Sequence, residues 1–208
     1  MIIKLSDARI NADIELHYSD PSGYDNWIVE TLGESNPLHA GLVAALTNYV
    51  SPWATVLDLG CGTGWCGKKL QLAQHLGQRI GCDMSLPMLR QADSLGVYGL
   101  LYYCDACRVF EELRGLATQV DWALCLLMCC YLDAVSLQEL LRELFSSCRQ
   151  GFIVSFEDYG EDMLICGTVL LYSHTYSDVC AQLAPGWQVE VLAGDVDAVM
   201  LLLFTRTD

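Results

Sequence analysis

The residues with the clearest chemical potential form the segment VLDLGCGTG at residues 56–64, an apolar run followed by glycine at alternate positions. Glycine lacks a Cβ, so such a turn can adopt positive φ and lets a ligand lie against the backbone. Because a helix is expected directly after the turn, the ligand would also meet the positive end of that helix. The segment therefore predicts a ligand cradle formed by Gly60, Cys61, Gly62 and Gly64.

Two classes of ligand fit a glycine-rich turn of this kind. Residues 62–67 (GTGWCG) also match the G-x-G-x-x-G pattern of dinucleotide-binding proteins, which is a weak signal when it stands alone. Asp58 argues against that class, since a negative charge just before the loop disfavours a pyrophosphate. S-adenosylmethionine instead offers an ammonium and a sulfonium, both of which favour a nearby carboxylate. We therefore expect Asp58 and the loop to hold the amino-acid end of that cofactor.

Two further acidic residues follow the next apolar segments of the chain. Asp83 stands 25 positions after Asp58, where a carboxylate can accept both hydrogens of a ribose diol. Asp105 could accept from an exocyclic adenine amine, with Met84 supplying a soft apolar face for the ring. Each carboxylate alone also fits a solvated turn or a helix cap, an alternative that carries most weight for Asp105. Together they predict a ligand crevice at one rim of a parallel sheet.

The elements that must position these residues alternate between short apolar strands and helices, which is typical of a mainly parallel sheet. Only residues 194–197 join the last two strands, too few for a crossover helix, so the final strand is expected to run antiparallel to its neighbour. We predict an α/β, Rossmann-like fold with helices on both faces of the sheet. The expected strands are 55–59, 79–83, 99–103, 122–127, 151–156, 188–193 and 198–205, and the expected helices are 64–76, 86–94, 107–113, 136–149 and 175–183.

The first fifty residues show a different pattern, of loops and amphipathic helices. A helix over residues 25–32 would place Trp27, Ile28 and Leu32 on one face, and Pro37 is expected to open a second helix. We predict that residues 1–50 form a helical cap or lid over a ligand-binding domain at residues 51–208. An ordered packing segment is an equally good interpretation of the same pattern.

Composition restricts the partners and the location. The chain has 208 residues, 53% of them hydrophobic, which favours one globular domain. Its formal charge of −15 disfavours nucleic acid and anionic membranes as partners. Cysteines within apolar runs, and the lack of a signal segment or a membrane-length apolar run, predict a cytoplasmic protein. Cys104 and Cys107 form a CxxC without a second ligand pair, so no metal is expected. Nothing in the sequence indicates an oligomeric state.

With these motifs in view, residues 20–208 resemble the class I S-adenosylmethionine-dependent methyltransferases. VLDLGCGTG matches their first motif; GCDMSLPMLRQA is similar to the second, YYCDA to the third and VDWALCLLMCCYL to the fourth. The resemblance implies a seven-stranded sheet, a helical N-terminal cap, and cofactor contacts from Ala106, Cys125 and Leu126. YDNWIVETLGESNP, GVY and LYSHTYSDVCAQL further resemble a subgroup of small methyltransferases labelled tetratricopeptide-repeat or Williams–Beuren-region, although no such repeats occur here.

The cofactor motifs, the aromatic cap and the acidic composition together predict transfer of a methyl group to an oxygen or nitrogen of a small organic molecule in an enclosed pocket. Because such a transfer is an in-line displacement, positioning can supply most of the acceleration, and a base is optional. Candidate catalytic residues are Tyr18 in the cap, Tyr131 after the fourth strand and His174 before the last helix, each of which also fits an ordinary packing role. Cys130 stands where many relatives have a histidine, so no base is carried over there. Glu157 follows the fifth strand on the same rim.

Two alternatives remain open from the sequence. The fold could serve as a binding or scaffold module that activates a protein partner, because fold alone does not establish activity. A cofactor-bound enzyme could also catalyse a rearrangement without methyl transfer.

Overall fold

A computed structural model describes residues 1–5, 11–31, 33, 36–165, 167–196 and 199–207. Within these residues an eight-stranded sheet has the strand order β1-β4-β3-β2-β5-β6-β10-β9. The strands are β1 (Ile2–Lys4), β2 (Val56–Leu59), β3 (Arg79–Asp83), β4 (Leu100–Tyr103), β5 (Val120–Cys125), β6 (Cys148–Glu157), β9 (Trp187–Val196) and β10 (Val199–Arg206). A separate hairpin pairs β7 (Met163–Ile165) with β8 (Val169–Leu171).

The direction of the strands confirms the predicted mainly parallel sheet with an antiparallel last strand. β2 pairs in parallel with β3 and with β5, while β10 pairs antiparallel with both β6 and β9. In the parallel register Leu59 lies opposite Cys82 on β3 and Cys125 on β5. The carboxyl ends of these strands therefore meet at one rim of the sheet, which is where a doubly wound fold binds its ligands.

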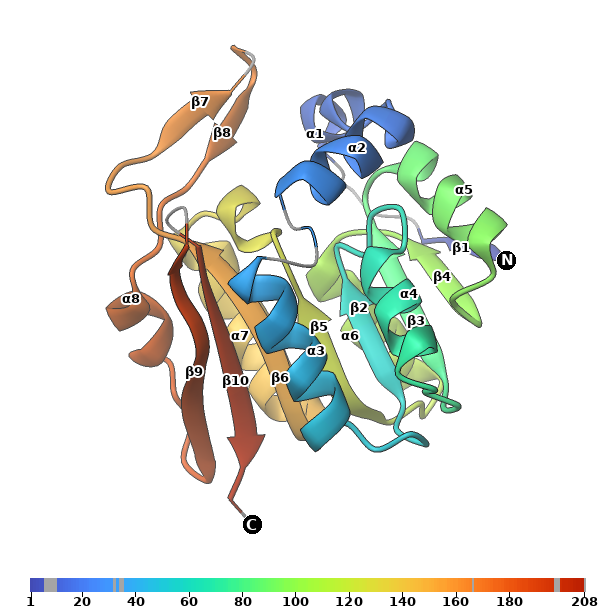
Figure 1. Cartoon of the computed structure of the whole chain (residues 1–208), viewed down its shortest axis with the longest axis vertical. Helices are drawn as coiled ribbons and strands as arrows, with labels where there is room; N and C mark the ends of the chain where they lie inside the picture. Colours follow the sequence, from blue (N-terminus) through green and yellow to red (C-terminus); the bar gives the residue numbers. More distant parts are fainter. Residues whose placement is uncertain (6–10, 32, 34–35, 166, 197–198, 208) are drawn as a thin grey trace.

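Helices cover both faces of the sheet (Figure 1). On one face, the buried side chains of Leu42 and Leu46 pack with Val56 and Leu124. On the other face, the buried side chain of Leu140 packs in one cluster with Phe152. Burial of such alternating side chains on both sides explains why the central strands read as continuous apolar runs. The first face carries α3 (Pro37–Tyr49), α4 (Trp65–Leu72) and α5 (Leu86–Leu95), and the second carries α6 (Ala106–Gly115), α7 (Ala134–Ser147) and α8 (Tyr176–Cys180).

The N-terminal segment is divided between two places. α1 (Ala12–His17) and α2 (Pro21–Thr31) lie beyond the carboxyl ends of the strands, at the top of Figure 1. α3 instead packs on the sheet beside β9 and β10, and its Leu42 is buried in the core. The expected boundary between a cap at 1–50 and a domain at 51–208 stays a prediction, and α1 and α2 are the helices placed to act as a lid.

Three details differ from the sequence-based expectation. β1 adds an eighth strand, and the β7–β8 hairpin was not predicted; each of these strands has three residues, too few for a periodic pattern. The expected helix at 25–32 begins earlier, at Pro21. It packs through the half-buried Tyr24 and the buried Ile28, which are one turn apart, while Trp27 is 46% exposed. Leu32, expected on the same face, lies outside the described residues.

No helix among the described residues combines the length and the apolar character that a membrane span requires.

Candidate functional site

A pocket lies at the carboxyl ends of β2, β3 and β4, with residues of α1 and α2 on its opposite wall. The loop after β2 and the residues that end β3 and β4 form its floor. Sulfur-containing side chains, among them Cys82, Met88 and Cys104, give it a soft apolar surface. Eight residues proposed from the sequence line this one pocket: Tyr18, Gly60, Gly62, Asp83, Met84, Asp105, Ala106 and Tyr131.

The glycine loop brings backbone to the pocket surface. Gly60 and Gly62 have φ of 65° and 51°, in the left-handed region that favours glycine. A Cβ at Gly60 would lie 2.7 Å from Cγ of Met128, closer than real side chains approach. A Cβ at Gly62 would lie 3.5 Å from the ring of Tyr24 on the lid. The loop thus presents main chain where a ligand can lie against it, as the sequence predicts.

Asp83 connects the glycine loop to the end of β3. Its Oδ2 accepts a hydrogen bond from the backbone N–H of Gly62 at 2.8 Å, and its Oδ1 accepts from that of Ser85 at 2.7 Å. Burial raises the pKa of Asp83 to about 6, although these backbone N–H groups oppose the rise. Because each carboxylate oxygen has a second acceptor site, Asp83 can still accept the two hydroxyls of a ribose.

Asp58 is held inside the protein rather than in the pocket wall. The hydroxyl of Tyr98 donates a hydrogen bond to its Oδ2, and the same hydroxyl accepts from the backbone N–H of Gly67 at 3.1 Å. Burial raises the pKa of Asp58 to about 7, and the hydrogen bond from Tyr98 lowers it in part. Asp58 therefore joins the end of β2 to the start of α4, and its contact with a cofactor ammonium stays a prediction.

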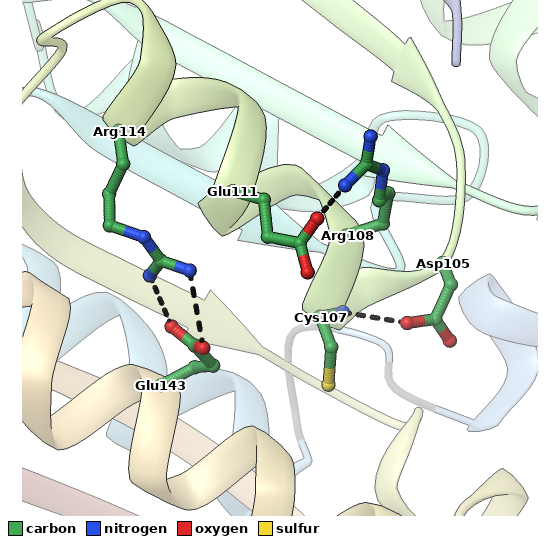
Figure 2. Close-up of polar contacts among 6 residues, drawn as sticks. All are labelled: Asp105, Cys107, Arg108, Glu111, Arg114 and Glu143. Atoms are coloured by element: carbon green, nitrogen blue, oxygen red, sulfur yellow. Dashed lines mark hydrogen bonds and ion pairs between the residues drawn. The ribbon is translucent and has the colours of Figure 1, made fainter. Parts of the chain in front are cut away.

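Asp105 combines both of the roles considered for it. Its Oδ1 accepts from the backbone N–H of Cys107 at 2.9 Å, so it caps the N-terminus of α6 (Figure 2). Asp105 also lines the pocket. Arg114, near the other end of α6, contacts Glu143 of α7 through both guanidinium nitrogens, at 2.5 and 3.4 Å. The cap and the ion pair hold the helix that carries Asp105.

Tyr18 and Tyr131 form the lid side of the pocket. Their hydroxyls are hydrogen-bonded to each other, and their rings meet edge to face with centroids 5.8 Å apart. Burial raises the pKa of both hydroxyls well above the ordinary value for tyrosine, so both stay protonated at neutral pH. Ser85 Oγ donates to the backbone carbonyl of Tyr18 at 3.1 Å, and Thr63 Oγ1 donates to Asp25 Oδ1 at 2.5 Å. Helices α1 and α2 are thereby bonded to the turn after β3 and to the glycine loop.

The remaining proposed residues lie elsewhere, and their roles stay predictions. Cys61 is buried against Leu101, and Gly64 is the left-handed N-cap of α4. Cys125 is buried with its Sγ 3.7 Å from that of Cys129, while Leu126 borders a smaller apolar pocket. His174 is not among the described residues that line the main pocket, and its Nε2 lies 2.8 Å from the carbonyl oxygen of Leu132.

Tyr24, which the sequence places in the cap with Tyr18, lines the pocket from α2. Sequence reasoning missed the role of Tyr98, which binds Asp58 across 40 residues of sequence. No sequence pattern indicates that contact, because it arises only from the tertiary fold. Over the residues that the structure covers, no group of three or more His, Cys, Asp or Glu side chains is arranged to hold a metal ion.

Comparisons with known proteins agree with this geometry. Residues 56–151 match a protein family described as a methyltransferase domain. None of the curated protein sequences compared with the chain matches it.

Solved structures resemble the whole chain. Magnesium protoporphyrin IX methyltransferase from Synechocystis PCC 6803, solved with bound S-adenosylmethionine, is 18% identical at a TM-score of 0.64, covering 97% of this chain and 100% of that one. DhpI in complex with S-adenosylhomocysteine is 15% identical at a TM-score of 0.69, covering 93% and 95%. An S-adenosylmethionine-dependent methyltransferase from Mesorhizobium loti is 18% identical at a TM-score of 0.60, covering 83% and 99%.

At these identities the solved structures establish the fold, and the family match covers the strands and loops that build the pocket. Residues 56–151 therefore resemble a methyltransferase domain, and the chain has the Rossmann-like fold that these solved S-adenosylmethionine-dependent methyltransferases share.

Proposed function

We propose that this protein transfers the methyl group of S-adenosylmethionine to a small organic molecule. One observation carries the proposal: a glycine loop whose backbone forms a pocket wall lies beside two carboxylates, Asp83 and Asp105, in that same pocket. These carboxylates suit the ribose hydroxyls and the exocyclic amine of an adenosine, while Asp58 at the end of the strand before the loop disfavours a dinucleotide pyrophosphate there.

The residues divide between the parts of the cofactor. Asp83 accepts the ribose hydroxyls with the acceptor sites that Gly62 and Ser85 leave open. Asp105 and Met84 take the adenine, with the backbone of Ala106 beside them. Gly60 and Gly62 border the amino-acid end, where a side chain would obstruct a ligand. When bound, the cofactor supplies a sulfonium methyl group that is ready for displacement.

The lid residues then position the acceptor. Tyr18, Tyr24 and Tyr131 enclose the opposite wall of the pocket, where their rings exclude water and their hydroxyls can orient a polar acceptor atom. Holding the acceptor and the methyl group in line supplies most of the rate acceleration in this chemistry. The pocket is enclosed by the lid, which favours a small molecule over a macromolecule as acceptor.

The neighbours and the sequence support the same substrate class. The name of the Synechocystis enzyme gives a small molecule, magnesium protoporphyrin IX, as the compound that it methylates. The net charge of −15 disfavours nucleic acid and anionic membrane surfaces as acceptors, and the same composition supports a cytoplasmic location.

A transfer assay tests the proposal. The purified protein is incubated with a metabolite extract and S-adenosylmethionine that carries a deuterated methyl group, and mass spectrometry searches for products with that group. We expect at least one small product that is absent when the Asp83→Ala variant replaces the wild type. A protein that binds the cofactor, labels nothing and retains a defined protein in pull-downs would support a scaffold role instead.

A further inference from the structure

Glu157, the last residue of β6, is a buried carboxyl group that no strong hydrogen-bond donor satisfies. Its side chain is 1% exposed, and among the described residues neither Oε1 nor Oε2 has a hydrogen-bond partner of ordinary geometry. Burial raises the pKa of Glu157 to about 7, and the Cys130 thiol and the backbone N–H groups of Cys130 and Glu157 near the carboxyl oppose the rise only in part. Folding alone does not explain a buried carboxyl of this kind, because leaving it unsatisfied destabilises the native state.

The surroundings of Glu157 belong to the acceptor side of the pocket. Cys130 immediately precedes Tyr131, and it packs in one apolar cluster with Tyr18, Tyr131 and Tyr159. The charge of Glu157 contributes to the raised pKa of Tyr18, after burial and the charges of Cys130 and Asp83, so the carboxyl lies within electrostatic reach of the pocket wall. Glu157 therefore stands next to the wall formed by the two tyrosines that close the pocket.

No described neighbour supplies a positive charge there. Cys129, Cys130, Tyr18 and Tyr159, the titratable groups whose pKa responds to Glu157, are thiols and phenols that burial keeps neutral at pH 7. His174 contributes its backbone N–H, which donates to the backbone carbonyl of Glu157 at 2.8 Å. Among the described residues that line the pocket itself, two are acidic and none is Lys, Arg or His. A cation is the group missing from this site.

We propose that Glu157 is the acceptor-binding carboxylate and that the acceptor is a small aliphatic amine. The inference rests on the proposed methyl transfer and specifies its substrate class. The amine N–H groups supply the hydrogen bonds that Glu157 lacks, and the rings of Tyr18 and Tyr131 contact the ammonium through their faces. Because the carboxyl is buried, the amine reaches it when the contact between the two tyrosine hydroxyls opens.

The proton balance follows from this arrangement. The ammonium gives one proton to the Glu157 carboxylate, which frees the nitrogen lone pair. That pair forms the new N–C bond while the S–C bond of the sulfonium breaks, and the breaking bond's electrons stay on sulfur. The product is an N-methylammonium, and Glu157 returns its proton to water when the lid opens.

Thermal unfolding in saturating S-adenosylhomocysteine tests the substrate class. The probes are primary and secondary aliphatic amines, each paired with the alcohol of the same carbon skeleton. We expect at least one amine to raise the Tm of the wild type more than its alcohol does, and this difference to disappear in Glu157→Gln. With S-adenosylmethionine, the same amine is methylated by the wild type, and kcat/KM falls by about 100-fold or more in Glu157→Gln.

The control is Glu161→Gln, on the exposed segment that follows β6, which we expect to behave as the wild type. Without ligand, Glu157→Gln should unfold at the wild-type temperature or above, because it removes an unsatisfied charge; a structural carboxylate would give a lower Tm. Equal stabilisation by amines and alcohols, or undiminished amine methylation by Glu157→Gln, would overturn the inference. If the wild-type protein still binds S-adenosylhomocysteine in that case, the proposed function stands. If the glutamine variant does not fold, the amine–alcohol comparison in the wild type decides, with Glu157→Asp as the second variant.

Discussion

Asp83 is the residue on which the geometry of the pocket depends most. One of its oxygens holds the glycine loop through Gly62 and the other holds the turn after β3 through Ser85. The same carboxylate therefore shapes the cradle and, in the proposed function, binds the ribose. A substitution of Asp83 would therefore affect both the shape of the loop and the binding of the ribose.

Replacing Asp83 with alanine is expected to weaken binding of S-adenosylhomocysteine by about 1–3 kcal/mol, because the ribose hydroxyls lose their acceptor. This corresponds to an increase in Kd of roughly 5- to 150-fold, measured by titration calorimetry. Asp93→Ala is the control, since Asp93 is exposed and its side chain contacts the N-terminal ammonium, away from the pocket residues. An unchanged Kd for Asp83→Ala would refute the ribose assignment.

For individual residues, the sequence predicted several that line the pocket, but not the side chains to which they are hydrogen-bonded. Gly60, Gly62, Asp83 and Asp105 lie together because each ends a strand of one parallel sheet, and strand ends are visible in the sequence. The hydrogen bond from Tyr98 to Asp58 is not visible there, because only tertiary packing brings the two residues together.

Helix α4 can pack close to Tyr98 and Val97 only because Gly67 has no Cβ. A Cβ at Gly67 would lie 2.7 Å from both Cζ of Tyr98 and Cγ2 of Val97. The helix must approach that closely for the backbone N–H of Gly67 to reach the hydroxyl that binds Asp58.

Gly67→Ala is therefore expected to destabilise the protein by about 1–3 kcal/mol, the cost of overpacking, despite alanine's higher helix propensity. Gly115→Ala, at the end of α6, is the matched change, because nothing lies within 4 Å of the added Cβ. It should be neutral or stabilise by up to about 1 kcal/mol. Urea unfolding measures both, and equal effects of the two substitutions would show that the contact with Tyr98 is unimportant.

The lid is the element expected to respond to ligand. Helices α1 and α2 are bonded to the cofactor-side loops through Ser85 and Thr63, so ordering of those loops should order the helices. We expect amide hydrogen exchange in residues 12–31 to slow when S-adenosylhomocysteine is added, while exchange in α7 stays unchanged. The same exchange rates with and without ligand would identify the segment as fixed structure.

Elements with a strong periodic pattern were predictable, and short ones were not. All seven expected strands of the central sheet exist, since those in its centre bury alternating apolar side chains on both faces. Strands β1, β7 and β8 were not predicted, because a strand of three residues is too short to show a periodic pattern. Trp27 is exposed because α2 packs through Tyr24 and Ile28 instead. Which side of this helix is buried depends on its tertiary packing, which the sequence pattern does not show.

Across the whole molecule, the excess negative charge and the buried carboxyl groups both lower the stability of the folded state as the pH rises. Burial raises the pKa to about 7 for Asp58, to about 6 for Asp83 and to about 7 for Glu157. Between about pH 4 and 7 the folded state therefore binds more protons than the unfolded state, so stability increases as pH falls through this window. The net charge of −15 also shrinks as the pH falls.

The Tm of the ligand-free protein is accordingly expected to be higher at pH 5.5 than at pH 8. Glu157→Gln should show a smaller increase, because one of the three groups no longer takes up a proton on folding. Differential scanning calorimetry at the two pH values measures both changes. A Tm that falls on acidification would contradict the assignment of these carboxyls as buried and destabilised by their charge.

The central claim is that the pocket at the carboxyl ends of β2, β3 and β4 binds S-adenosylmethionine, and calorimetric titration tests it most directly. Titrating S-adenosylhomocysteine, and separately S-adenosylmethionine, into the wild-type protein should give saturable binding, which the Asp83→Ala variant weakens. Thermal unfolding of the same sample establishes that the protein is folded. If a folded wild-type protein binds neither compound, the proposed function is wrong.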